Sequence, residues 1–301
     1  MGIFRWLLRR GKPKVTHGPW ERTITTASMG QEALAMRRYL EDTDYLLPKD
    51  AEEDARLNFQ HYALLHAIGN HYVAPLGPSV RLVLEVGAGT GIWASEMARL
   101  FPQAEVIGID IDPALFRAPA QLPENCLLRT GNVLTGLPFP DGIFSFTHQR
   151  LLVAAIPAGK WPGVVRELVR VTQPGGWVEI VEIDSEIERP GPATVKMHEL
   201  SAVLVDGEPI RHLDRMMRQA GLQDVETTRI PIPLGEWGGR VGSMMKRDLL
   251  SACDAFKGIC VQRGLINPQE YDQMTSDMAN EWEQLQSACV FYAVYGRQPA
   301  E

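Results

Sequence analysis

The feature that most constrains the fold is the stretch LVLEVGAGTGIWASEMA at residues 82–98, where an apolar run leads directly into three closely spaced glycines. Glycine loses more conformational freedom on folding than any other residue, so this cluster needs a reason. A short apolar run is typical of a strand buried on both faces of a parallel sheet, and residues 92–101 fit a helix. At the carboxyl end of such a strand, glycines let a ligand lie against the backbone, next to unpaired N–H groups of the helix.

Strand and helix patterns alternate over the next hundred residues. A helical pattern at 163–171 follows the fourth of several apolar runs. The first five expected strands are 81–86, 105–110, 126–131, 143–148 and 177–183. This order predicts a Rossmann-like, doubly wound α/β fold, in which helices cover both faces of a mostly parallel sheet.

The C-terminal third has looser patterns. Residues 193–204, 212–221 and 244–286 are predicted to be helical. The segment 225–234 is expected at a sheet edge, because prolines interrupt it. The chain then closes with a β-forming run at 288–296, directly after the long helical region. This order predicts helices inserted between two hairpin-paired strands, and hence a seven-stranded sheet whose last strand is antiparallel.

The region before the α/β pattern is predicted to be helical from residue 27 to about 75. Asp50 and Glu53 have the form of a capping box at the start of a helix. Three histidines follow at intervals of five: His61, His66 and His71. That spacing scatters them around a helix, which argues against a metal site.

Composition and charge exclude several classes of protein. The chain has 301 residues and a net charge of −7, without the basic surface that nucleic-acid binding needs. Its four cysteines form no CxxC pair and no zinc spacing, which indicates reduced thiols in a cytoplasmic protein. No apolar run approaches the roughly 20 residues of a membrane span, so no stable membrane insertion is expected. A homodimer is an assembly that the sequence leaves open.

The first fifteen residues, MGIFRWLLRRGKPKV, alternate basic and apolar side chains. Such an arm is able to touch a membrane surface. It is too short and too basic for a signal peptide and has no small-residue cleavage site. A frayed tail, or an arm packed on a neighbour, is the favoured interpretation.

The glycine spacing discriminates between kinds of nucleotide site. A dinucleotide fingerprint, G-x-G-x-x-G, needs a small residue where this chain has Ile92. Glu85 lies just before the loop, where a carboxylate repels a pyrophosphate but suits a ligand with an ammonium group. No Lys-Ser/Thr pair follows, which excludes a Walker loop. Asp110 fits either kind of ligand, so the case against a nicotinamide-dependent oxidoreductase rests on Glu85 and Ile92.

Together these motifs resemble the class I S-adenosylmethionine-dependent methyltransferases over about residues 81–184. The resemblance implies that the glycine loop lies against the methionine part of S-adenosylmethionine and that Asp110 hydrogen-bonds both ribose hydroxyls. Asn132 is a departure, because the family commonly has an acidic residue there that reaches the adenine amino group. The expected cofactor-binding residues are Glu85, Gly87, Ala88, Gly89, Gly91, Asp110, Ile111, Asn132, Val133 and Gln149.

A narrower resemblance links the segments YLLP, RLNFQH and IPAGKWPGVVRELVRVTQPGGW to small-molecule methyltransferases, including fungal proteins of secondary metabolism. It implies that the N-terminal helical segment is a lid over the cofactor, where Tyr45 shapes the methyl pocket. Arg56 either pairs with the cofactor carboxylate or faces solvent. His61 lies on an apolar helix face, which favours a hydrogen-bonded histidine in the core. His148 ends the fourth strand and is a candidate general base or a packing residue.

The sequence therefore predicts a basic arm (1–26), a helical lid (27–76), a cofactor-binding core (77–190) and a remainder with substrate-capping helices (191–301). The predicted function is in-line transfer of a methyl group from S-adenosylmethionine to O, N or C of a small molecule, without a metal. Four methionines are expected to wall a substrate pocket or to pack in the core: Met216, Met217, Met244 and Met245. The alternative is a regulatory or scaffolding protein that binds the cofactor without turnover, because a fold does not guarantee chemistry.

Overall fold

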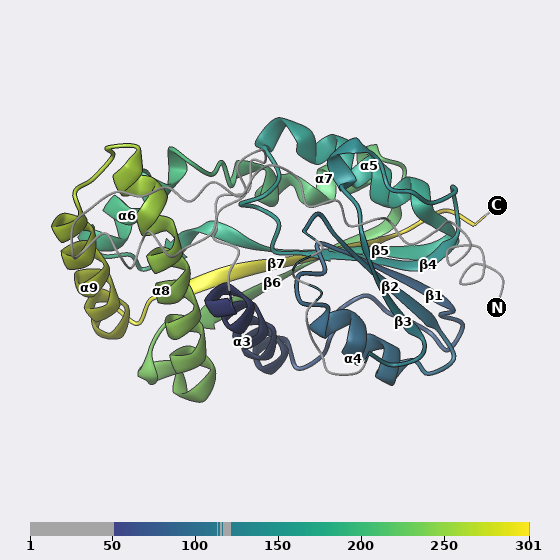
Figure 1. Cartoon of the computed structure of the whole chain (residues 1–301), viewed down its shortest axis with the longest axis horizontal. Coiled ribbons are helices and arrows are strands. Elements are labelled where there is room, and N and C mark those ends of the chain that lie inside the picture. Colours follow the sequence, from purple (N-terminus) through teal and green to yellow (C-terminus); the bar gives the residue numbers. More distant parts are fainter. Residues whose placement is uncertain (1–50, 113, 115, 117–121, 301) are drawn as a thin grey trace. The chain divides into compact units, whose positions relative to one another are not determined.

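A computed structural model of the protein shows one seven-stranded sheet with helices on both faces (Figure 1). The structure describes residues 51–300 except 113, 115 and 117–121, and these belong to one compact unit. The basic arm, Tyr45 and Asp50 lie outside the described residues. The strands are β1 (Leu82–Val86), β2 (Glu105–Asp110), β3 (Cys126–Thr130), β4 (Phe144–Arg150), β5 (Thr172–Glu188), β6 (Gln223–Pro233) and β7 (Ala288–Arg297).

The sheet has the order β3-β2-β1-β4-β5-β7-β6. Strands β1 to β5 pair in parallel, because helices or loops carry the chain back between them. β7 is antiparallel to both of its neighbours, β5 and β6. The predicted Rossmann-like, mostly parallel sheet with an antiparallel last strand is therefore confirmed.

Helices cover the two faces of the sheet (Figure 1). α4 (Ile92–Leu100) lies on one face, where its Trp93 is buried in one core cluster with Phe146 of β4. α5 (Trp161–Val171) and α7 (Leu213–Gln219) lie on the other face. α5 buries a stripe of apolar residues spaced three and four apart, as a helix that packs on a sheet with one face must. This packing fixes the start of α4 against the end of β1, where the glycine loop lies.

The helices inserted before the last strand are α8 (Gly239–Gln262) and α9 (Pro268–Gln284). α8 packs against α3 (Ala51–Ile68) and α9, while α9 also packs against α6 (Pro192–Ala202). β6 lies at the edge of the sheet beside β7, so the predicted edge strand and the predicted insertion are confirmed. None of the helices within residues 51–300 combines the length and the apolar character that crossing a membrane requires.

The N-terminal helical region ends earlier than predicted. α3 ends at Ile68, not near residue 75, because Gly69 follows it with a φ of +78° and the chain turns there. His71 therefore lies outside the helix that carries His61 and His66. The argument that scattered all three histidines around one helix is wrong.

Two further boundaries differ from the predicted ones. β5 runs from Thr172 to Glu188, longer at both ends than the apolar run that predicted it. The region predicted to be helical over 244–286 begins earlier, at Gly239, and is divided into α8 and α9, because Gly264 has a φ of +67° and Asn267 caps the second helix. The Asn267 side chain accepts from the Glu270 N–H at 2.9 Å, a hydrogen bond that marks a helix start.

Candidate active site

A cavity of about 440 Å³ opens at the carboxyl ends of β1, β2 and β4 and reaches the loop after β3. We call it the first cavity. The strand register brings the last residues of β2 and β4 level with the residue that follows β1. Gly87, Asp110 and Arg150 therefore lie next to one another at this edge of the sheet. Eight of the predicted cofactor-binding residues line the cavity: Glu85, Gly87, Ala88, Gly89, Asp110, Ile111, Asn132 and Val133.

The three glycines of the loop serve different purposes. All have a positive φ, +73° at Gly87, +55° at Gly89 and +78° at Gly91, which L-residues rarely adopt. A Cβ on Gly91 would lie 2.4 Å from Leu128 Cδ1, and Gly91 is outside the cavity wall as the structure describes it. A Cβ on Gly89 would meet Leu57 Cδ1 at 3.6 Å, in the wall itself. Gly91 thus allows close packing, whereas Gly89 keeps backbone exposed to the cavity.

Asp110 is buried and holds the glycine loop in place. Its Oδ2 accepts from the Gly89 N–H at 2.8 Å, and its Oδ1 accepts from the Asp112 N–H at 3.0 Å. Each carboxylate oxygen has two acceptor positions, so one on each oxygen is left for a further donor. This arrangement fits a pair of neighbouring hydroxyl groups, such as those of a ribose.

Glu85 is buried at the base of the first cavity, and burial raises its pKa to about 8, with nearby Arg150 acting in the opposite direction. Glu85 Oε2 accepts from the Ala94 N–H at 3.1 Å. A carboxyl group with this pKa is largely protonated at neutral pH. A ligand ammonium group beside it would favour the charged carboxylate. Glu85 therefore fits the amino end of S-adenosylmethionine.

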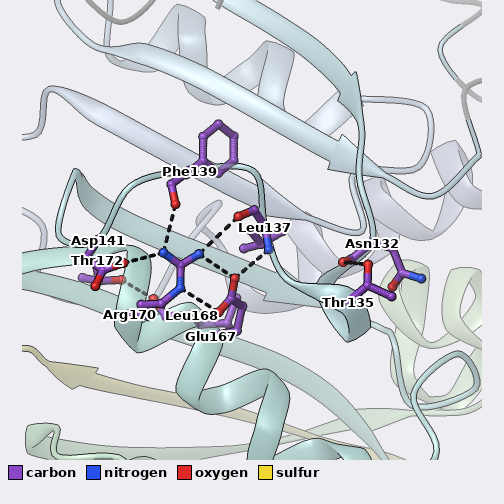
Figure 2. Close-up of polar contacts among 9 residues, drawn as sticks. All are labelled: Asn132, Thr135, Leu137, Phe139, Asp141, Glu167, Leu168, Arg170 and Thr172. Carbon is purple, nitrogen blue, oxygen red and sulfur yellow. Dashed lines mark hydrogen bonds and ion pairs between the residues drawn. The ribbon is translucent and has the colours of Figure 1, made fainter. Parts of the chain in front are cut away.

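The loop after β3 carries Asn132 and Val133, and Arg170 of α5 ties it down (Figure 2). The guanidinium donates to side chains and carbonyl oxygens on and beside this loop: Glu167, Asp141, Leu137 and Phe139. The hydrogen bond from Arg170 holds the pKa of the Glu167 carboxyl below its ordinary value. Glu167 also accepts from the Leu137 N–H at 2.6 Å, so both members of the ion pair are hydrogen-bonded to the loop.

The Asn132 side chain is hydrogen-bonded to the local backbone. Its Oδ1 accepts from the Leu134 N–H at 2.9 Å and starts a short 3₁₀ turn, η2 (Val133–Thr135). Figure 2 shows Asn132 and Thr135, at the start and end of this turn, beside the Arg170 cluster. The amide oxygen still has a second acceptor position, which remains for a ligand amine.

A polar network beside the first cavity is absent from the predictions made from the sequence. Glu96 Oε2, on α4, lies 2.7 Å from His61 Nε2 and 2.7 Å from His71 Nε2. Arg150 Nη2 donates to His61 Nδ1 at 2.9 Å. Arg150 and His61 line the first cavity. The turn after α3 brings His71 close to His61, and no local sequence pattern predicts this proximity.

His61, His71 and Glu96 have the composition of a metal site, with ligand atoms within 4.8 Å of one another. A guanidinium has only N–H donors, so the bond from Arg150 makes His61 Nδ1 an acceptor. Burial, helped by Arg150, lowers the pKa of His61 to about 4, so the ring is neutral and carries its proton on Nε2. That proton is donated to Glu96. This tautomer leaves no lone pair at Nε2 for a metal and opposes metal binding.

His148 and Gln149 lie outside the described wall of the first cavity. The His148 ring stacks on Trp93 with ring centroids 3.9 Å apart, and its Nε2 lies 3.7 Å from Glu179 Oε1. Burial holds the pKa of His148 well below its ordinary value. Gln149 is also buried, and its Nε2 donates to Glu182 Oε1 at 3.1 Å. The structure thus separates these two side chains from the eight that it brings together.

Two other expectations are settled by burial. Arg56 is buried and donates to Glu53 and Asp248, so the solvent-facing alternative is wrong. The bond to Asp248 connects α3 to α8. Met217 and Met245 are fully buried in the core, which confirms the packing alternative for both.

A second cavity, of about 250 Å³, adjoins the first, and three residues line both of them: Leu57, Gln60 and Leu151. Its wall is mostly apolar and comes from α3, the loop after β4, β5, α6, α8 and α9. Phe256 and Trp282 contribute aromatic rings to it. Because these elements are far apart in the chain, the sequence contains no motif for this cavity.

Comparisons with known proteins identify methyltransferases as relatives of this chain. The family model described as "Methyltransferase domain" matches residues 83–176. Methyltransferase str2 of Strobilurus tenacellus is 29% identical over 269 residues, which cover 83% of this chain and 94% of the relative. N-methyltransferase gliN of Aspergillus fumigatus is 26% identical over 281 residues, which cover 86% and 98%. Phosphoethanolamine N-methyltransferase 2 of Haemonchus contortus, solved with S-adenosyl-L-methionine, has a TM-score of 0.51 at 14% identity over 82% of this chain and 52% of that chain, a likeness of fold.

Proposed function

Since the chain is a class I S-adenosylmethionine-dependent methyltransferase, we propose that its acceptor is a small, largely apolar molecule that binds in the second cavity. One observation carries the proposal, namely that an apolar cavity of about 250 Å³ shares part of its wall with the first cavity. A molecule in the second cavity meets the cofactor at this shared boundary. The volume suits a small molecule, and the wall favours carbon surface over charge.

The cofactor is assigned to the first cavity. In this proposal Asp110 accepts from the ribose hydroxyls, Glu85 faces the ammonium group, and Asn132 and Val133 border the adenine. The buried carboxyl of Glu85 and the free acceptor positions of Asp110 support these roles. When bound, S-adenosylmethionine supplies an electrophilic methyl group on its sulfonium.

Gln60 is the polar residue among the three that line both cavities. Its Nε2 donates to Asp248 Oδ2 at 2.8 Å. This bond uses the amide nitrogen, so the amide oxygen remains as an acceptor for an N–H or O–H group of the ligand. A neutral amine attacks the methyl group with its lone pair, the S–CH3 bond breaks to release S-adenosylhomocysteine, and the methylated ammonium then loses its proton to water, so no protein base is needed before the transfer. We therefore favour nitrogen as the methylated atom, which agrees with the N-methyltransferases among the relatives. His148 has no part in this mechanism, because it lies outside the described wall of the first cavity. The role of Tyr45 in the methyl pocket stays a prediction.

In this proposal the protein accelerates methyl transfer mainly by positioning the acceptor. Holding the acceptor in line with the S–CH3 bond at near-attack distance is worth several kcal/mol, about 7–11 in the best intramolecular cases. The apolar wall of the second cavity also keeps water from the methyl group. Both effects need the second cavity to be filled by the acceptor.

The test measures transfer of a tritiated methyl group to a panel of apolar amines and phenols, with Ala252→Phe as the variant. Ala252 lines the second cavity, and a phenylalanine there fills it. We expect a loss of turnover of at least 20-fold with unchanged affinity for S-adenosylhomocysteine. Ala202→Phe, the same change at an exposed alanine of α6, is the matched control and should leave both quantities unchanged. Intact cofactor binding without turnover of any panel member would favour the regulatory or scaffolding alternative.

A further inference from the structure

We propose that Arg150 binds the carboxylate of the cofactor's amino-acid end and that His61, held by Glu96, is the positioning residue for its guanidinium. The inference rests on the proposed methyl-transfer site and names a contact within it. No sequence motif assigns this role to Arg150.

The place of Arg150 in the sheet is the first step. β2 and β4 flank β1, so Asp110 and Arg150 lie on opposite sides of the glycine loop. The ribose and the carboxylate are at opposite ends of the methionine chain in S-adenosylmethionine. With the ribose at Asp110, the amino-acid end crosses Gly87 and reaches β4.

The charge of Arg150 is the second step. Within the described wall of the first cavity, Arg150 is the one Lys or Arg residue. Glu85 lies beside it and acts on it electrostatically. An ammonium group and a carboxylate on the same carbon therefore find a carboxyl and a guanidinium side by side. Charges of both signs are matched without an extra ion.

The hydrogen bonds of Arg150 are the third step. Among the described residues its guanidinium makes one hydrogen bond, to His61 Nδ1, and no ion pair. A guanidinium has five N–H donors in a fixed plane that suits two-point binding of a carboxylate. Arg150 is partly buried in the cavity wall, where a cation is stabilised by an anion, so its other N–H donors favour a ligand carboxylate as partner.

His61 determines the direction in which Arg150 points. Both of its ring nitrogens are engaged, Nδ1 by Arg150 and Nε2 by Glu96. Glu96 also accepts from His71, which anchors the carboxylate from a second side. The chain of contacts from Glu96 on α4 through His61 on α3 to Arg150 on β4 therefore fixes the guanidinium at the rim of the first cavity.

The experiment compares S-adenosylmethionine with its decarboxylated analogue, which lacks only the carboxylate, by calorimetric titration. We expect the wild type to prefer S-adenosylmethionine by at least 30-fold. Arg150→Met should lose this preference by weakening S-adenosylmethionine at least 30-fold while the analogue changes less than threefold. His61→Phe should reduce the preference about fivefold. Arg99→Met, the same change at an exposed arginine of α4, should keep it.

The ratio of the two dissociation constants separates a specific contact from a structural one. Equal weakening of both ligands in Arg150→Met would overturn the proposal and leave the cofactor assignment intact. If Arg150→Met does not fold, the wild-type preference decides, because the absence of any preference would also overturn the proposal. Wild-type protein that binds neither ligand would instead overturn the proposed function itself.

Discussion

The first and the second cavity are built in opposite ways. The wall of the first comes mainly from the glycine loop and the strand ends beside it, and it presents backbone groups, carboxyl groups and a guanidinium. The wall of the second is assembled from α3, the loop after β4, β5, α6, α8 and α9, and it presents mostly carbon. A ligand with several charges needs particular groups at particular places, whereas an apolar ligand needs only a surface of suitable size. The chemistry of the first cavity is therefore local in the chain, and that of the second is not.

The largest expected effect separates two glycines of the same loop. Gly91→Ala should lower the free energy of unfolding by about 3 kcal/mol, because it combines a positive φ with overlap on Leu128. Gly89→Ala has only the conformational cost, about 1 kcal/mol, and should act mainly on cofactor affinity. Urea unfolding and titration with S-adenosylhomocysteine measure the two quantities. Equal losses of stability in both variants would show that the loop glycines are not divided between packing and binding.

The glycine loop could be predicted from the sequence, because positive φ angles require glycines and a charged site requires charged residues, and both are visible in a short stretch of chain. The strand before Gly87, the carboxylate of Glu85 and the end of β2 at Asp110 were all predicted from short patterns, and the structure brings these side chains to one cavity. The contact between His61, Glu96 and Arg150 was not predicted, because it depends on how α3 packs on the sheet. Hydrophobic periodicity specifies which face of α3 is buried but not what it meets.

The next prediction tests whether ionisation of Glu85 lowers the free energy of unfolding of the protein without its cofactor. With its pKa raised to about 8, Glu85 binds a proton in the folded protein that the unfolded chain releases near pH 4.5. Its contribution to stability is complete below pH 4.5 and is lost as the pH rises through 8, at about 1 kcal/mol per pH unit. Glu85→Gln should remove this part of the slope in urea unfolding between pH 5.5 and 8.5.

Glu179 and Glu182 share this behaviour, since burial raises the pKa of each to about 7. The slope should therefore become shallower in Glu85→Gln without vanishing. Glu182→Gln is the matched control, because Glu182 lines neither the first nor the second cavity as described. S-adenosylmethionine should flatten the slope in wild type and leave that of Glu85→Gln unchanged. A wild-type slope unaffected by the ligand would contradict a role for Glu85 at the ammonium group.

The second cavity marks the limit of sequence-based prediction in this chain. The helices that build it were predicted from their patterns, and their insertion before β7 was confirmed. Which of their side chains face one another was not predictable, because an apolar residue in a helix serves the core and a ligand equally well. The methionines show this ambiguity, since Met217 and Met245 lie in the core whereas Met197 and Met278 line the cavity.

The smallest expected effect concerns the part of the first cavity that depends on a long-range contact. Arg170→Met removes the hydrogen bonds that tie the loop carrying Asn132 to α5 (Figure 2). The Arg170 side chain is 32% exposed, so we expect a loss of only about 1 kcal/mol in unfolding free energy, with roughly threefold weaker cofactor binding. Arg166→Met, at an exposed position of the same helix, should change neither. A fall in stability with unchanged affinity would mean that the adenine end of the cavity, like the glycine loop, is organised locally.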